Sequence, residues 1–197
     1  MPTPERTSPP PDASDTEPPR PQPTTVVLVR HGLTPTTGKQ LPGRTAGLHL
    51  SEDGRSQAKE AAEQVAHLHA REGGQVSRLF ASPLERTVET AEPIAAAVGL
   101  DIETDADLLD IDVGDWTGMT LEEAGKRPEW HMVQRYPSAF GFPGGESFLD
   151  MQIRLVNRVN HWRTAHPGET VVAVTHADPI RMIAAHALGV HLDLFQR

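Results

Sequence analysis

The stretch Val26-Val27-Leu28-Val29-Arg30-His31-Gly32 decides the fold class of this 197-residue chain. Four consecutive apolar residues are typical of a strand that is buried on both faces, as in a parallel sheet. The run ends in an arginine, a histidine and a glycine, and ligands of open parallel sheets bind beyond the carboxyl ends of the strands. A second run, Val171-Val172-Ala173-Val174-Thr175, is also followed by a histidine, His176. Two buried strands that each deliver an imidazole to one sheet edge predict a site there.

Strand and helix patterns alternate from residue 25 onwards. We expect Pro93 to kink or split the helix that contains it, and the stretch around Trp130 and Tyr136 to be irregular. Alternating strands and helices predict an α/β protein, a three-layer sandwich in which helices flank a mostly parallel central sheet. The predicted strands are 25–30, 76–81, 100–103 and 170–175, and the predicted helices are 51–71, 83–98, 120–127, 147–165 and 179–188.

Residues 1–24 differ in composition from the rest of the chain. Nine of the 18 prolines fall there, and large apolar side chains are almost absent. Such a segment cannot bury enough apolar surface to offset the entropy lost on ordering. We therefore expect a disordered proline-rich tail at 1–24 and a single folded domain at 25–197.

The composition argues against several kinds of partner and chemistry. A formal net charge of −9 disfavours binding to nucleic acid or to an anionic membrane. The absence of cysteine removes disulfides, thiolate nucleophiles and cysteine-bound metals. No apolar stretch approaches the length of a membrane span. We expect a cytoplasmic protein with no nucleic-acid partner and no membrane partner.

The side chains at three strand ends suit a phosphoryl group. Arg30 and His31 follow the first strand, Arg86 follows the second, and His176 follows the last. The guanidinium fork matches phosphate oxygens bidentately and keeps its charge. A neutral imidazole can act as a nucleophile or as an acid. Because a leaving alkoxide also needs a proton, a nearby carboxylic acid would complete a phosphoryl-transfer site.

These segments resemble the histidine phosphatase superfamily, specifically branch 1, the phosphoglycerate-mutase-like group. The resemblance covers about residues 25–195, and relative to that family the chain looks C-terminally truncated. The segments that carry the resemblance, in chain order, are Arg30-His31-Gly32, Ser82-Pro83-Leu84-Glu85-Arg86-Thr87, Asp110-Ile111-Asp112-Val113-Gly114-Asp115-Trp116-Thr117-Gly118, Gly144-Gly145-Glu146-Ser147 and Thr175-His176-Ala177.

The resemblance implies a role for each matching residue. His31 takes the place of the histidine that becomes phosphorylated, and His176 takes the place of the second histidine of the site. Arg30 and Arg86 take the places of phosphate-binding arginines. Thr37 falls where an asparagine often contacts phosphate, and its hydroxyl can still donate a hydrogen bond.

The segment that supplies the catalytic acid departs from the family pattern. Asp110 stands where glutamate is usual, so its carboxyl is one methylene closer to the backbone, and Asp112 is a rival for the same role. Glu146 in the Gly-Glu-Ser turn can be explained by the dipole of the helix that follows it. We therefore take Asp110 as the expected acid and leave Asp112 open.

The expected function is hydrolysis of a small-molecule phosphomonoester through a phosphohistidine intermediate, with no cofactor and no metal. A cofactor-dependent phosphomutase of the same family is an alternative, although the resemblance implies that the short stretch 119–143 favours hydrolysis. A non-catalytic phospholigand-binding module is an alternative from another class. A metallophosphatase that uses His176 and Asp178 is a third. Neither the substrate nor the oligomeric state can be predicted from the sequence.

Overall fold

The structure is a computed structural model that describes residues 22–71 and 73–197. In this part of the chain the centre is a four-stranded sheet whose neighbouring strands are all parallel, in the order β1-β4-β2-β3. The expected tail, residues 1–24, lies almost entirely outside the described residues. The strands are β1 (Thr25–Arg30), β2 (Val76–Ala81), β3 (Glu103–Thr104) and β4 (Thr170–Thr175).

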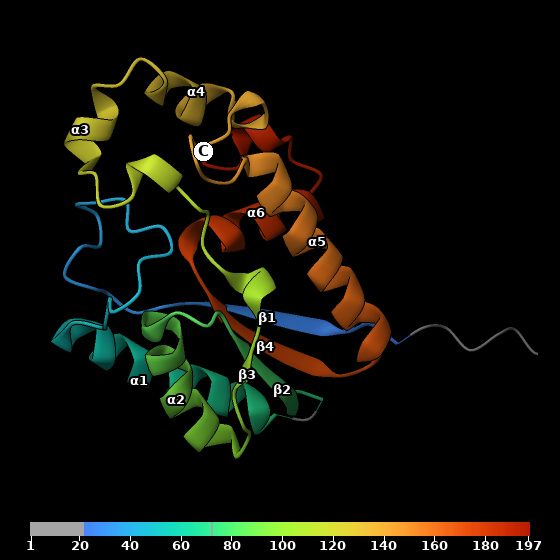
Figure 1. The fold of residues 1–197 in the computed structure, drawn as a ribbon. Helices are drawn as coiled ribbons and strands as arrows, with labels where there is room; N and C mark the ends of the chain where they lie inside the picture. Colours follow the sequence, from blue (N-terminus) through green and yellow to red (C-terminus); the bar gives the residue numbers. More distant parts are fainter. Residues whose placement is uncertain (1–21, 72) are drawn as a thin grey trace, which may run out of the picture.

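Helices lie on both faces of the sheet (Figure 1), so the predicted three-layer α/β architecture is confirmed. The first two helices cover one face, and the last two long helices cover the other. Two short helices lie further from the sheet, beyond its carboxyl edge. The helices are α1 (Glu52–His69), α2 (Glu85–Val98), α3 (Leu121–Gly125), α4 (Trp130–Arg135), α5 (Phe148–Ala165) and α6 (Ala177–Ala187).

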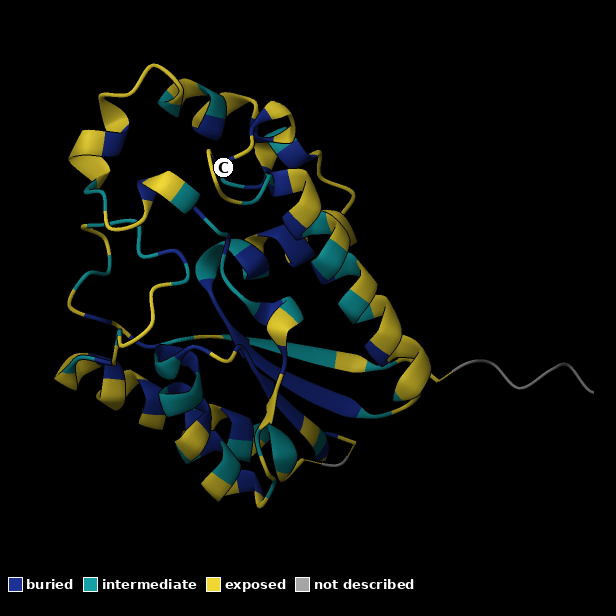
Figure 2. Ribbon diagram, in the orientation of Figure 1, coloured by how far each residue is buried: buried dark blue, intermediate teal, exposed yellow. Residues whose placement is uncertain are grey.

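Each face of the sheet has its own apolar core. Val172 and Val174 of β4 pack toward α1 and α2, where Ile94 is fully buried. Val171, from the opposite face of the same strand, packs with Trp162 of α5. Figure 2 shows the result, with β4 buried throughout between the two helical layers. Burial on both faces explains why the strand sequence is continuously apolar.

The strand register brings the carboxyl ends of β1, β2 and β4 together. Arg30 at the end of β1 lies opposite Thr175, and Ala81 at the end of β2 lies opposite Val174. The next residues continue this alignment: the His31 N–H donates to the Thr175 carbonyl at 3.0 Å, and the Ser82 N–H donates to the Val174 carbonyl at 2.9 Å. The residues that directly follow β1, β2 and β4 therefore lie side by side at one edge of the sheet.

Three local expectations differ in part from the structure. Helix α2 is not split at Pro93, because the buried residues on both sides of the proline hold it against the sheet despite the missing N–H. The stretch expected to be irregular contains α4, whose Val133 is buried in the adjacent core. The short strand expected near 100–103 is present as β3, which begins at Glu103 and is only two residues long.

Candidate active site

His31 lies directly after β1, and the structure leaves one of its ring nitrogens available. Nδ1 lies 2.7 Å from the Gly32 carbonyl, to which it can only donate, so Nε2 carries the lone pair. Burial lowers the pKa of His31 to about 4, opposed by the Gly32 hydrogen bond and supported by the positive charges of Arg86 and Arg30. At neutral pH the ring is uncharged and can act as a nucleophile through Nε2.

His176 follows β4, occupies the N-cap position of α6 and is fully buried. Its ring centroid lies 5.2 Å from that of His31, in an edge-to-face arrangement. Nε2 lies 2.9 Å from Ser82 Oγ, whereas Nδ1 has no hydrogen-bond partner among the described residues. Burial, followed by the charge of Arg86, lowers the pKa of His176 well below its usual value. The pair of imidazoles is therefore neutral.

Arg86, in the first turn of α2, brings a fully buried positive charge to the histidines. Nη2 donates to the Gly43 carbonyl at 2.9 Å and lies 3.7 Å from Asp110 Oδ2. Nε and Nη1 have no hydrogen-bond partner in the described part of the chain. Buried donors without partners are costly, so these two N–H groups fit an anion that accepts from both of them.

Asp110 lies between two short 3₁₀ segments, η1 (Ala106–Leu108) and η2 (Gly114–Trp116), and its side chain is 17% exposed. Oδ2 lies 3.7 Å from both Arg86 Nη2 and His176 Nδ1. Burial, followed by the negative charge of Asp178, raises the pKa of Asp110 to about 7, although Arg86 opposes the shift. A carboxyl with this pKa carries a proton part of the time at neutral pH and can act as an acid.

Asp112, the rival acid, faces a different partner. Its Oδ1 accepts from the Gly114 N–H at 3.0 Å, and its Oδ2 lies 3.9 Å from Arg44 Nη1. No contact with Arg86 or His176 is recorded for Asp112 across residues 22–71 and 73–197. The structure thus brings Asp110, rather than Asp112, to the two histidines.

Arg30 and Thr37 share a cavity of about 260 Å³ with His31, beside the exit of β1. The Thr37 hydroxyl accepts from the Thr34 N–H at 2.9 Å and lies 2.9 Å from Thr34 Oγ1, which fixes its position on the cavity wall. Arg30 is exposed on this side. The predicted site residues therefore form two adjoining groups that share His31. One group contains Arg86, Asp110 and His176, and the other contains Arg30 and Thr37.

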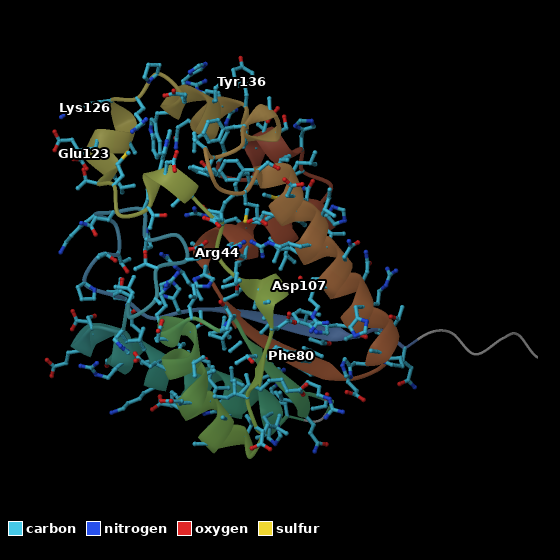
Figure 3. The ribbon with its side chains drawn as sticks, in the orientation of Figure 1. Arg44, Phe80, Asp107, Glu123, Lys126 and Tyr136 are labelled. Atoms are coloured by element: carbon cyan, nitrogen blue, oxygen red, sulfur yellow. The ribbon has the colours of Figure 1, made fainter. Side chains whose placement is uncertain are left out.

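Sequence reasoning missed a cluster of charged residues that holds the acid segment. Two arginines donate to the Asp110 carbonyl: Arg44 Nε at 2.9 Å and Arg154 Nη2 at 3.3 Å. Glu146 pairs with both, at 3.0 Å to Arg44 Nη2 and 2.7 Å to Arg154 Nε. Arg154 also donates to the Asp107 carbonyl at 2.6 Å. Arg44 and Asp107 are labelled in Figure 3 near the middle of the molecule, between the sheet and the outer short helices.

Two neutral imidazoles, a buried guanidinium and a protonatable carboxyl lie together at the carboxyl edge of a parallel sheet, where α/β proteins bind ligands, and their charges and donors suit a phosphoryl group. The profile of the histidine phosphatase superfamily (branch 1) matches residues 26–197. The chain therefore belongs to this superfamily.

Relatives and solved structures agree with that assignment. The chain is 35% identical to the bifunctional protein Rv2228c of Mycobacterium tuberculosis over 87% of its own length and 48% of the relative's, so it spans about half of that protein. It is 34% identical to phosphoserine phosphatase 1 of Hydrogenobacter thermophilus, covering 86% of this chain and 79% of that one. The mycobacterial glucosyl-3-phosphoglycerate phosphatase Rv2419c superposes with a TM-score of 0.75 at 28% identity, covering 86% and 82% of the two chains.

Two features are absent from residues 22–71 and 73–197. No helix there is long and apolar enough to cross a bilayer. No group of three or more histidine, aspartate or glutamate side chains in the same residues is arranged to hold a metal ion.

Proposed function

We propose that residues 25–197 form a phosphomonoester hydrolase that transfers the phosphoryl group first to His31 and then to water. The observation that carries this proposal is the buried Arg86 guanidinium, whose two unpartnered N–H groups lie beside the neutral His31 and His176 pair. An anion that accepts from Arg86 would lie next to the nucleophilic nitrogen. A phosphate dianion has the charge and the oxygen geometry for this place.

The proposed reaction has two steps. In the first, His31 Nε2 attacks phosphorus in line while the ester P–O bond breaks, and Asp110 gives its proton to the departing alkoxide. Arg30, Arg86 and His176 hold the phosphoryl oxygens. In the second step, the Asp110 carboxylate takes a proton from water, the water oxygen bonds to phosphorus, and the N–P bond breaks. Inorganic phosphate leaves, and Asp110 is protonated again.

Hydrolysis is favoured over phosphomutase activity by two observations. The similar proteins named above include a phosphoserine phosphatase and a glucosyl-3-phosphoglycerate phosphatase. The stretch 119–143 carries the short helices α3 and α4 and the 3₁₀ segment η3 (Pro137–Ala139), and the resemblance to the family implies that a mutase would have a longer insertion there. The proposed substrate is a small phosphomonoester. The cysteine-free sequence is compatible with a reducing compartment, and we propose that the protein is cytoplasmic.

A panel of phosphomonoesters, assayed for release of inorganic phosphate with and without a chelator, tests this function. We expect turnover of at least one alkyl phosphate, stoichiometric phosphate release and no loss of rate with chelator. A product that keeps its phosphoryl group on a different hydroxyl would indicate a mutase. Binding of inorganic phosphate without turnover of any ester, including p-nitrophenyl phosphate, would indicate a binding module instead.

A further inference from the structure

The Ser82 hydroxyl is a buried polar group that the reaction above does not use. Ser82 follows β2 directly and is fully buried. Within the described ranges, its Oγ makes a single hydrogen bond, to His176 Nε2 at 2.9 Å. The opposite ring nitrogen, Nδ1, faces Asp110 Oδ2 at 3.7 Å, which is too long for a hydrogen bond. One nitrogen of His176 is therefore engaged, and the other is open toward the site.

Two arrangements of protons are possible along this contact. If His176 carries its proton on Nε2, that N–H donates to Ser82 Oγ, and the serine's own proton is left without an acceptor in a fully buried position. If Ser82 donates to Nε2, the serine proton has an acceptor and the histidine proton must be on Nδ1, which has no hydrogen-bond partner among the described residues. Each arrangement leaves one donor without a partner, but Nδ1–H faces the Asp110 carboxyl and the site, where an oxygen can accept from it, whereas the buried Ser82 proton has no other acceptor among the described residues. The second arrangement is therefore the stable one.

We propose that Ser82 is a positioning residue that fixes the tautomer of His176, so that Nδ1–H points at the bound phosphoryl group. The inference rests on the proposed function, because it assumes that a phosphoryl group occupies the space beside Nδ1. In the other tautomer, the Nδ1 lone pair would face the phosphoryl oxygens and repel them. Ser82 thus converts a neutral imidazole from an acceptor into a donor.

A neutral His176 carries one ring proton, so it can donate from Nδ1 only in the tautomer that has this proton on Nδ1. Arg86, His31, Arg154 and Arg30 all disfavour a charged His176. The ionised Asp110 carboxylate would attract a proton to Nδ1, and so would act in the same direction as Ser82. The protonated carboxyl would instead offer its own proton to Nδ1. Ser82 is therefore needed most when Asp110 carries the proton that the reaction uses.

Histidine ¹⁵N NMR measures the tautomer directly, because protonated and bare ring nitrogens differ in chemical shift. The spectrum is recorded at about pH 6, below the raised pKa of Asp110 and near the ordinary histidine value, where neutral rings stand out. We expect the wild-type protein to show His176 protonated on Nδ1, like His31. A wild-type His176 protonated on Nε2 would overturn the proposal without any variant.

Ser82→Ala supplies the second arm of the test, with Thr175→Val as the matched control. The Thr175 hydroxyl is also fully buried, but it donates to the Leu108 carbonyl at 2.6 Å and not to His176. We expect Ser82→Ala to lose the Nδ1–H signal of His176 and Thr175→Val to keep it. If Ser82→Ala keeps that signal, Ser82 does not set the tautomer.

Binding of inorganic phosphate, measured by titration, gives a readout that is separate from turnover. We expect Ser82→Ala to weaken binding about tenfold or more, as loss of a hydrogen bond to a charged group does, and Thr175→Val to bind as the wild type does. Unchanged phosphate affinity in Ser82→Ala would overturn the proposal. If the wild type binds phosphate, shows the Nδ1–H tautomer and hydrolyses nothing, the proposed function fails while this inference stands.

Discussion

Arg86 combines full burial with two donors that have no partner among the described residues. Its charge also influences its neighbours, since it lowers the pKa of both His31 and His176. In the proposed mechanism the same guanidinium holds the anion and adds to the effect of burial, which is the main cause of the lowered pKa of His31. Lysine could keep the charge, but it could not supply the planar pair of N–H groups.

Arg86→Lys should lower kcat/KM by about 10²-fold or more, comparable to the loss of one oxyanion-hole donor. The matched control is Arg78→Lys, because the Arg78 guanidinium is exposed and lies 4.0 Å from Glu103. Steady-state kinetics on the best phosphomonoester check both variants. Wild-type kcat/KM in Arg86→Lys would show that this guanidinium does not hold the phosphoryl group.

The pH dependence of kcat/KM should be bell-shaped for alkyl phosphates. His31 must be unprotonated to attack, so the rate should rise as pH increases through about 4, the lowered pKa of His31. Asp110 must be protonated to act as the acid, so the rate should fall as pH increases through about 7, its raised pKa. A pH–rate profile measured on an alkyl phosphate tests both limbs.

The variant Asp110→Asn distinguishes loss of the acid from a general disturbance of the site that would slow all substrates equally. It should abolish the fall near pH 7, and it should slow alkyl phosphates far more than p-nitrophenyl phosphate, whose leaving group needs no proton. Equal losses on both substrates would remove Asp110 from the acid role. In that case, Asp112→Asn becomes the variant to measure.

Between elements, Glu146 connects three segments that are far apart in the sequence. It lies before α5, binds Arg154 on that helix, and binds Arg44 in the loop after β1. Both arginines donate to the carbonyl of Asp110. The backbone of the acid segment is therefore held from two sides, which fixes the direction of the Asp110 side chain.

Glu146→Gln should destabilise the protein by about 3 kcal/mol, because it leaves two partly buried guanidiniums without their carboxylate. Glu122→Gln is the control, since Glu122 forms an exposed pair with Lys126 and its loss should have no measurable effect. Chemical denaturation gives both free energies of unfolding. Equal stability of the two variants would show that the Glu146 bridge does not hold the acid segment.

Two glycines allow β1 and α1 to approach at the edge of the site. A Cβ on Gly54, in the first turn of α1, would lie 2.0 Å from the Leu33 carbonyl oxygen. A Cβ on Gly32 would lie 2.3 Å from the Gly54 carbonyl oxygen. Backbone atoms cannot rotate away as a side chain can, so the loop that carries His31 would have to shift.

Gly54→Ala should therefore lower the free energy of unfolding by at least about 2 kcal/mol through overpacking. Gly125→Ala is the matched control at the end of α3, where a Cβ meets nothing within 4 Å. There, alanine should raise stability by about 0.5 kcal/mol, since it is the better helix former. A stable, fully folded Gly54→Ala variant would contradict the close approach of β1 and α1.

The sequence predicts well the elements that have a recognisable pattern of apolar residues. The apolar runs of β1 and β4 define these strands, and their parallel pairing then brings His31 and His176 to one edge. By contrast, β3 has only two residues, which are too few to make a pattern. Arg44 and Arg154 meet at the Asp110 carbonyl through tertiary folding, and no local sequence rule connects a loop arginine to one on a distant helix.

At the scale of the whole molecule, the net charge and the charge of the site have opposite signs. The chain carries a formal charge of −9, yet Arg86 presents, at the carboxyl edge of the sheet, donors that have no partner within residues 22–71 and 73–197. Because dissolved ions screen charges that lie more than about 10 Å apart at moderate salt, the charge nearest to a bound ligand matters more than the net charge of the chain. The sheet matters because it brings the arginine, two histidines and the acid segment to one place from separate parts of the chain.

Acid and alkali quenching during turnover of a ³²P-labelled phosphomonoester tests the central claim most directly. The account predicts a labelled protein whose phosphate is lost in acid and kept in alkali, as expected for phosphohistidine. The label should be absent in His31→Ala and present in His67→Ala, a control at an exposed histidine of α1. An acid-stable label, or a label that persists in His31→Ala, would contradict the account.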